Sequence, residues 1–396
     1  MKIPDEVTNI SGIEAGYTID DWSAAVTKYF CPYVRRTSIL HSQRHLLRSE
    51  LINLARILPH PQYVDLLAWL SKTYHSAIRK DRSGAFAYLV DRFEDTGAVD
   101  ARWMSLYATH KPLPKGTALE DRAFRIFDGL DAILEGCFKP HLRLAYGFAV
   151  RETSGLFPSQ VQAMDFGNLV SEWPKPLVAP AEVMLRDPEY GISTSQWRNI
   201  AAHKNFAMKS SRTFEVEYGN SKNRKSRRIT FAGLNRVLKW AMLVQCSVRL
   251  SNTLLYLEYM RDLHDIGLPD PPFRFDGWMI ALSHNYSLVG FKCLEYYKSG
   301  SNLTLKLQDR MSRQLMESII HASQILVNLS LAVKSDLSYR KTIHRLTVAI
   351  VDEVDTVLAS ASVDVEKAFA FADRRIAQKT YVRLVDFQFY SPPQAR

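Results

Sequence analysis

Apolar residues recur every three to four positions through most of the chain, which is the period of an amphipathic helix. Residues 37–58 follow this period, and Pro59 and Pro61 predict that the helix ends there. The same pattern predicts further helices at 61–79, 83–93, 98–109, 117–137, 139–153 and 157–173. The first half of the chain is therefore expected to be mostly helical.

After Phe206 the period changes from that of a helix to that of a strand. Apolar and polar residues alternate over 213–218, turn-forming residues follow at 219–223, and 227–231 returns as a second strand. A long helix is then predicted from about 233 to 264. We therefore expect a β-hairpin that leads into a long helix.

Proline-rich stretches at 111–116 and 269–272 interrupt these patterns and predict boundaries. We expect a mainly α fold in three parts: a helical N-terminal region at 1–112, a central helical bundle at 117–265 with a hairpin insertion at 206–231, and an α+β region at 270–396. In the last region, β-like pieces near 286–297 and 381–389 are expected to mix with helices near 303–333, 340–350 and 351–374.

Basic residues are concentrated around the predicted hairpin. The chain carries a formal net charge of +10, and nine of its Lys and Arg residues lie between 198 and 228, against the two acids Glu215 and Glu217. Such a surplus favours a polyanionic partner. The residues expected to hold an RNA backbone here are Lys209, Arg212, Lys222, Arg224, Lys225, Arg227 and Arg228.

Several classes of protein are excluded by what the sequence lacks. The four cysteines are scattered and form no CxxC pair, which argues against a zinc ribbon or a disulfide scaffold. P-loop, Rossmann and nucleophile-elbow motifs are missing. The first ten residues lack the apolar core of a secretory signal, and the uncharged apolar stretches fall short of the ~20 residues of a membrane helix. We expect a cytoplasmic protein with no membrane partner, cofactor or metal.

The residues best suited to chemistry lie in a short helix predicted to begin at Ser193, which forms a capping-box pattern with Gln196. Within the following WRNIAAH segment, Asn199 and His203 are four residues apart and share a helix face. Arg198 can reach past the edge of the helix. A histidine can transfer a proton near neutral pH, and an arginine fork can hold a phosphate. This set suits RNA strand scission without a metal.

Arg198, Asn199 and His203, followed by a basic hairpin and a long helix, resemble the HEPN superfamily of nucleotide-binding and ribonuclease domains over about residues 117–265. The resemblance implies a homodimer in which two copies of the motif form one metal-independent endonuclease site. It implies that Arg198 and His203 are the arginine and histidine of the family motif and that Asn199 is the polar residue that follows the arginine. Lys204 and Asn205 lie outside the motif and are expected phosphate contacts. The resemblance further implies a toxin or abortive-infection effector, with a regulatory or antitoxin protein as a further partner.

Other readings of the same residues stay open. The bundle could be a non-catalytic module for nucleic-acid binding or dimerisation, or a DNA-binding protein. Phe206, Phe214 and Tyr218 could stack on bases or pack against the long helix. Outside the bundle, His41 and His45 have the spacing of a metal pair but are expected on an exposed basic surface. The acidic cluster Asp352, Glu353 and Asp355 is expected to form the solvated start of a helix.

Overall fold

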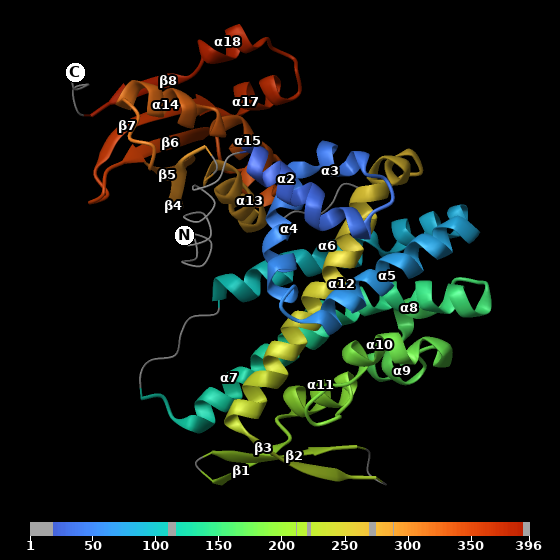
Figure 1. The fold of residues 1–396 in the computed structure, drawn as a ribbon. Helices are drawn as coiled ribbons and strands as arrows, with labels where there is room; N and C mark the ends of the chain where they lie inside the picture. Colours follow the sequence, from blue (N-terminus) through green and yellow to red (C-terminus); the bar gives the residue numbers. More distant parts are fainter. Residues whose placement is uncertain are drawn as a thin grey trace. The chain divides into compact units, whose positions relative to one another are not determined.

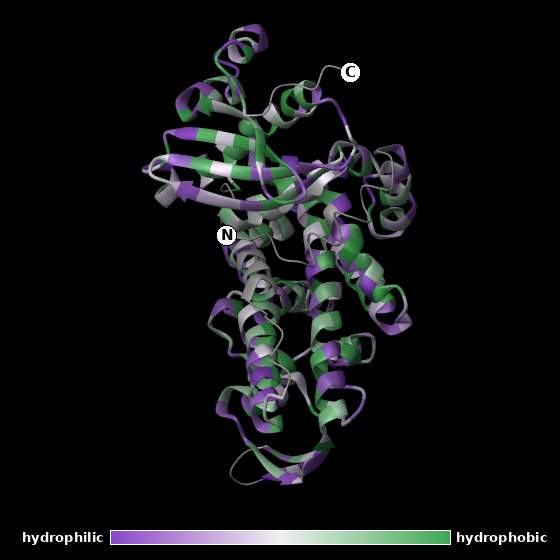
Figure 2. Ribbon diagram, turned by 90° about the vertical axis from the view of Figure 1, so that its left-hand side faces the viewer, coloured by the Kyte–Doolittle hydropathy of each residue, from purple (hydrophilic) through white to green (hydrophobic). Residues whose placement is uncertain are grey.

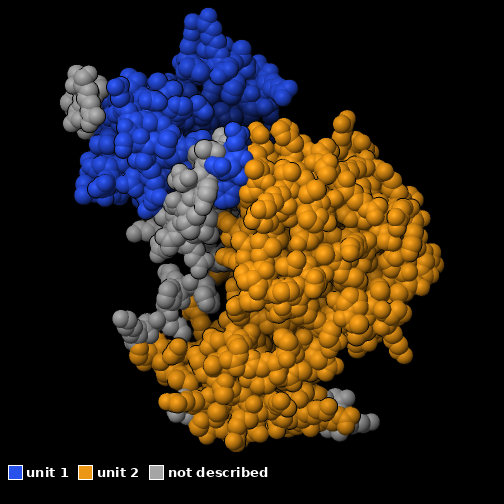
Figure 3. Space-filling model, viewed as in Figure 1, with its two compact units in different colours: residues 1–22, 272–396 blue, residues 23–271 orange. Residues whose placement is uncertain are grey.

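The computed structural model describes residues 19–109, 116–210, 212–219, 223–268, 275–287 and 289–390. The chain forms two compact units, shown in two colours in Figure 3. The larger unit is Ser23–Pro271, and the smaller one combines Met1–Trp22 with Pro272–Arg396. The expected mainly α architecture is confirmed, since helices dominate and the strands are confined to two small sheets.

The larger unit is helical apart from one small sheet (Figure 1). Its longer helices are α2 (Ile19–Phe30), α4 (Arg44–Ile57), α5 (Pro61–Lys80), α6 (Arg82–Thr109), α7 (Leu119–Asp131), α8 (Lys139–Ser154), α10 (Val178–Leu185), α11 (Thr194–His203) and α12 (Phe231–Asp265). Short helices are α3 (Ser38–Ser42), α9 (Phe166–Ser171) and the 3-10 turns Cys31–Tyr33, Val161–Ala163 and Lys175–Leu177. A π-helical segment, Ala132–Phe138, joins α7 to α8.

Helix α12 is the centre of this unit. It is 35 residues long and buries side chains around its whole circumference, so it needs packing partners on every side. Those partners are α4 and α5 as well as α7, α8 and the π-helical segment. The expected regions 1–112 and 117–265 are therefore not two separate compact units, because both supply helices to the packing around α12.

Buried polar contacts fix α12 within the bundle. Arg249 binds the Glu50 carboxylate of α4 through two hydrogen bonds of 2.7 and 2.9 Å. One turn further on, Asn252 accepts a hydrogen bond from the Tyr74 hydroxyl (2.6 Å) and lies 3.0 Å from the His141 imidazole of α8. Paired charges and satisfied amides are the form in which polar groups are tolerated in a core.

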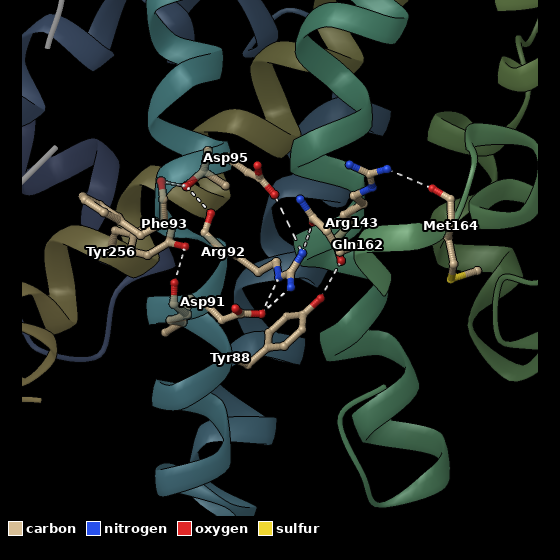
Figure 4. A network of polar contacts seen from close by, with 11 residues as sticks. Tyr88, Asp91, Arg92, Phe93, Asp95, Arg143, Gln162, Met164 and Tyr256 are labelled. Carbon is tan, nitrogen blue, oxygen red and sulfur yellow. Dashed lines mark hydrogen bonds and ion pairs between the residues drawn. The ribbon is translucent and has the colours of Figure 1, made fainter. Parts of the chain in front are cut away.

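A second polar network ties α6 to α8 and to the loop that follows α8 (Figure 4). The Arg92 side chain is 9% exposed and hydrogen-bonds to Asp91 and to Gln162. Arg143 donates to the Met164 carbonyl at 2.9 Å. Both arginines thus hold the segment around 162–164, which has little regular structure of its own, against the helices.

The small sheet of this unit consists of β1 (Phe206–Ser210), β2 (Thr213–Tyr218) and β3 (Lys225–Thr230), antiparallel and in sequence order. The predicted hairpin is present and gains β1 as a third strand. Phe206 stacks on Phe127 of α7, with ring centroids 4.6 Å apart, and Phe214 is fully buried. Figure 1 shows the sheet at the end of the unit where α12 begins, next to α7 and α11.

The smaller unit contains a five-stranded sheet in the order β4–β5–β6–β7–β8, in which only β5 and β6 are parallel. The strands are β4 (Phe291–Ser299), β5 (Asn302–Asp309), β6 (Arg345–Val351), β7 (Val357–Asp364) and β8 (Asp386–Phe389). The helices are α13 (Phe275–Ser287), α14 (Leu315–Ser323), α15 (Ile325–Ser335), α16 (Leu337–Arg340), α17 (Val365–Ala372) and α18 (Gln378–Val382). One apolar core is shared by the strands and by α13, α14, α15 and α17.

Several predicted elements of this region are wrong. The helices expected at 340–350 and 351–374 contain β6 and β7, and the one expected at 303–333 begins with β5. In β6 the run of apolar residues is nearly continuous and buried, and such a run does not distinguish a central strand from a buried helix. In β5 and β7 apolar residues alternate with polar or small ones, which is a strand pattern that the helical prediction overlooked. The stretch Leu315–Ser335 is apolar and long enough to cross a membrane, but half of it is buried and it forms α14 and α15 of this core.

In the larger unit, the helix expected at 37–58 is interrupted at Gln43, between α3 and α4. The helices expected at 83–93 and 98–109 are one continuous helix, α6. The region 157–173 contains only a 3-10 turn and α9, because the Asp165 side chain caps a new helix by accepting from the Asn168 amide. The boundaries at 111–116 and 269–272 fall almost entirely outside the described residues.

Candidate functional site

The site is built on α11, the ten-residue helix that contains Arg198, Asn199 and His203. The predicted N-cap is confirmed, since Ser193 Oγ accepts from the Gln196 amide at 3.3 Å. The Gln196 side chain does not complete the capping box. Its Oε1 instead accepts from the Gly219 amide at 2.9 Å, which ties the helix to the end of β2.

Buried groups fix α11 in position. Trp197 is completely buried, and its indole Nε1 donates to Asp187 at 2.8 Å. The same carboxylate accepts from three backbone amides of the loop before the helix, including that of Ile192. Thr194 donates its hydroxyl to the Met184 carbonyl at 2.6 Å. The helix that carries the functional residues is therefore held in place by several independent contacts on its buried side.

Arg198 faces the π-helical segment. Its Nε donates to Glu135 Oε2 at 2.7 Å, and its Nη1 donates to Asn199 Oδ1 at 3.1 Å. Glu135 also binds Lys139, four residues later, at 2.6 Å. Burial alone would raise the pKa of Glu135, but the hydrogen bonds from Arg198 and Lys139 outweigh it and hold this pKa below its usual value. Arg198 is thus oriented by a charged carboxylate, and among the described residues no hydrogen bond is made by its Nη2.

His203 is the last residue of α11 and is exposed. It lies one turn after Asn199 on the same face of the helix. In the described part of the chain, no group hydrogen-bonds to its imidazole. The ring is therefore exposed to a ligand, while the cation and the amide of the motif are already paired with each other.

Lys204 and Asn205 have structural tasks. Lys204 ends α11 in the left-handed conformation (φ +52°), and its Nζ lies 2.5 Å from Asp128 and 2.8 Å from the Ala201 carbonyl. The Asn205 carbonyl accepts from the Glu217 amide at 3.0 Å, so the backbone passes directly from the helix into the sheet. Neither contact tests the expectation that these two side chains touch phosphate.

Sequence reasoning missed the acidic residues that face the motif. Asp128, Asp131 and Glu135 follow one another along α7 and the π-helical segment. The pKa of Asp131 is raised by burial, against the opposing effect of Lys204 and Arg198. The available signal was the pair Glu135 and Lys139, whose spacing of four is that of a helical ion pair. Nothing in the sequence indicated that this pair would meet Arg198.

The basic residues of the sheet do not share one environment. Lys209 pairs with Glu215 at 2.7 Å, and Arg224 pairs with Glu217. Arg212, Lys225, Arg227 and Arg228 are exposed. For Arg212, Lys225 and Arg227 the structure shows no ion pair with any described residue. Lys222 lies outside the described residues. Figure 2 shows hydrophilic residues in purple along these strands.

The aromatic residues of the sheet are mostly structural. Phe206 and Phe214 pack between Phe127 of α7 and Phe231 at the start of α12, so they are not available to stack on a base. Tyr218 is different, because it is only half-buried at the open end of β2.

The two minor candidates do not form sites. His41 lies in α3 and His45 in α4, on opposite sides of the break at Gln43, so they do not share a helix face. The cluster of Asp352, Glu353 and Asp355 is not a helix start. It is the turn between β6 and β7, where Asp352 accepts from two backbone amides and Asp355 binds Lys306 at 2.8 Å. Among the described residues, no group of three His, Cys, Asp or Glu side chains is arranged to hold a metal ion.

No protein-family model, curated protein or solved structure matches this chain.

Proposed function

We propose that the chain is a metal-independent RNA endonuclease of the HEPN type. The observation that carries the proposal is the arrangement on α11, where Arg198 is oriented by Glu135 and Asn199 while His203 stays exposed on the face it shares with Asn199. A fixed cation and an accessible imidazole on one short helix are the groups that phosphodiester cleavage by an RNA 2′-hydroxyl requires.

In this mechanism Arg198 binds the scissile phosphate through Nη2 and the remaining proton of Nη1 and stabilises the charge that develops in the transition state. His203 acts in proton transfer. The 2′-oxygen attacks phosphorus and loses its proton, and the 5′-oxygen of the next nucleotide leaves and gains one. The products are a 2′,3′-cyclic phosphate and a 5′-hydroxyl. Asn199 holds the guanidinium in place.

One chain supplies one motif histidine, whereas the reaction needs one group to accept a proton and one to donate it. Two copies that bring their α11 helices together would supply both. The exposed position of His203 leaves room for such an approach. We therefore propose a homodimer with a composite site. A role as a toxin or abortive-infection effector, restrained by a regulatory protein in the cytoplasm, is the setting in which such an activity would be useful.

Incubation of the full-length protein with total RNA in EDTA tests the proposal, alongside His203→Ala and Arg198→Ala. Cleavage by the wild type and none by the two variants supports it. Cleavage that depends on added divalent metal, or that persists in His203→Ala, contradicts it.

A non-catalytic RNA-binding module is the second candidate, and one observation favours it. Arg198 is already paired with Glu135, as expected for a structural arginine. In that case RNA binding is retained in His203→Ala, and neither the wild type nor the variant cuts RNA in cells that produce it.

A further inference from the structure

The register of the three-stranded sheet separates its basic residues into two faces. Residues directly opposite each other on neighbouring strands lie on the same face. Phe214 pairs with Ile229, Val216 with Arg227, and Tyr218 with Lys225. Because Phe214, Val216 and Ile229 are fully buried, this is the face that packs on the helices. Arg227 lies on the same face, opposite Val216, but is exposed on the edge strand. Tyr218 and Lys225 continue this face one pair further along the strands.

The opposite face is close to neutral. Its central strand contributes Glu215 and Glu217, and each carboxylate is paired with a basic side chain. Lys209 binds Glu215 from β1, and Arg228 lies opposite Glu215 on β3. Arg224 binds Glu217. Hydrogen bonds from Lys209 and Ser226, with the charge of Arg228, lower the pKa of Glu215. The cations of this face therefore serve mainly as counter-ions within the sheet.

Lys225 and Arg227 have no such counter-ions among the described residues, and both are exposed. They are two residues apart on the edge strand β3, so their attachment points are roughly 7 Å apart. This separation is comparable to that of neighbouring phosphates along an extended nucleic-acid strand. Tyr218, directly across from Lys225, places a half-buried ring beside them.

These three residues border the motif helix. The residue before Tyr218, Glu217, donates its amide to the Asn205 carbonyl at 3.0 Å, just after α11. The residue after it, Gly219, donates its amide to Gln196 of α11 at 2.9 Å. Tyr218 is thus held between two hydrogen bonds to the segment that contains Arg198 and His203. Strand β2, which pairs with β3, thus connects these residues to the segment that carries the motif.

We propose that Tyr218, Lys225 and Arg227 form a binding site for single-stranded RNA that delivers the strand to α11. Lys225 and Arg227 bind successive phosphates, and Tyr218 stacks on one unpaired base. A duplex cannot offer that base without breaking a pair, so the site selects single-stranded substrate. The inference rests on the proposed function, because it names the substrate of the same site.

The test compares two double variants that remove equal charge from β3 and the residue just before it. Lys225→Gln/Arg227→Gln removes the two cations of the proposed site, and Arg224→Gln/Arg228→Gln is the matched control. Both are made in full-length His203→Ala protein, so that binding is measured without cleavage. The probes are a fluorescein-labelled single-stranded RNA 12-mer and the same sequence as a duplex, with binding followed by anisotropy at several salt concentrations.

The first double variant should weaken single-strand binding about tenfold or more and reduce the slope of log K against log salt by about 1.4, the value for two phosphate contacts. The control should change both much less. Equal weakening in the two double variants would overturn the proposal, because it would mean that only net charge matters. Equal affinity of the His203→Ala protein for the single strand and the duplex would also overturn the proposal.

Tyr218 provides an independent arm. Tyr218→Leu should weaken single-strand binding about fivefold to tenfold, a typical loss for one stacked base, while Tyr218→Phe should restore it. Equal loss in both variants would rule out stacking. If this binding pattern holds but wild-type protein cuts no RNA, the ribonuclease proposal fails and the binding site stands. If the wild type cuts RNA but Lys225→Gln/Arg227→Gln and Tyr218→Leu leave binding unchanged, the binding-site proposal fails and the ribonuclease proposal stands.

Discussion

Arg198 and Glu135, 63 residues apart in the chain, meet at 2.7 Å between the guanidinium Nε and a carboxylate oxygen. Glu135 lies in the π-helical segment between α7 and α8, a type of distortion that is frequent at functional sites. The contact makes Glu135 the residue that orients the proposed phosphate clamp, and it leads to the first prediction.

Glu135→Gln is expected to slow RNA cleavage about tenfold to a hundredfold, because a neutral amide holds Arg198 less firmly and small errors in a clamp are costly. The measurement is the single-turnover cleavage rate of a labelled RNA. Asp128→Asn is the control, since Asp128 is one of the acidic residues that face the motif but pairs with Lys204. Equal rates for the wild type and Glu135→Gln would show that the ion pair does not support catalysis.

His141 makes the larger unit sensitive to acid. Burial, reinforced by the charge of Arg249, lowers the pKa of His141 to about 3. The unfolded chain takes up a proton on this histidine near the usual pKa of about 6.5, whereas the folded chain does not. The free energy of unfolding therefore falls as the pH drops from about 6.5 toward 3. The contribution approaches about 1.4 kcal/mol per pH unit. His141→Gln should flatten this slope in urea unfolding between pH 7 and 5, and the exposed control His41→Gln should not. An unchanged slope in His141→Gln would contradict the assignment.

Gly147 of α8 leaves room for Tyr88. A Cβ atom at this position would lie 2.1 Å from the Tyr88 hydroxyl, which donates to the Arg143 carbonyl. Gly147→Ala should therefore lower the free energy of unfolding by ~1–3 kcal/mol, the usual effect of overpacking. Gly129→Ala is the matched helical control, because its Cβ would meet only Leu238 at 3.7 Å, and it should stabilise the protein slightly. Equal stabilities would argue against this packing of Tyr88.

The buried pair of Glu50 and Arg249 predicts a strong asymmetry between single and double variants. Arg249→Met leaves a carboxylate in a site where its side chain is 10% exposed, and the expected loss is ~3–5 kcal/mol. Adding Glu50→Leu removes that stranded charge and should recover most of the loss. Chemical unfolding of the two variants measures the difference. Additive losses would mean that the two residues do not act as a pair.

Much of the larger unit could be predicted because its helices follow clear amphipathic periods. The bounds of α5 and α12 differ from the predicted ones by only a few residues, and the N-cap at Ser193 was visible in the sequence. In the smaller unit, β6 and β7 were mistaken for helices because they are buried on the core side and rich in small and apolar residues. Parallel pairing of β5 with β6 joins residues 43 positions apart in the chain, which local patterns do not encode.

The candidate site was predictable only as far as it lies in one helix. Arg198, Asn199 and His203 were indicated by local spacing. Glu135 was not, because its role depends on how α7 and the π-helical segment pack beside α11. The sequence likewise did not show that the basic residues of the hairpin fall into two groups. Only the strand register separates Lys225 and Arg227 from Arg224 and Lys209, which are paired with acidic residues.

The chemical identity of the RNA ends tests the central claim most directly. A defined single-stranded RNA is incubated with wild-type protein in EDTA, and the fragments are analysed by mass spectrometry, with His203→Ala in parallel. The account predicts fragments with 2′,3′-cyclic phosphate and 5′-hydroxyl ends from the wild type and intact RNA from His203→Ala. Fragments with 3′-hydroxyl and 5′-phosphate ends, or the same fragments from His203→Ala, would contradict it.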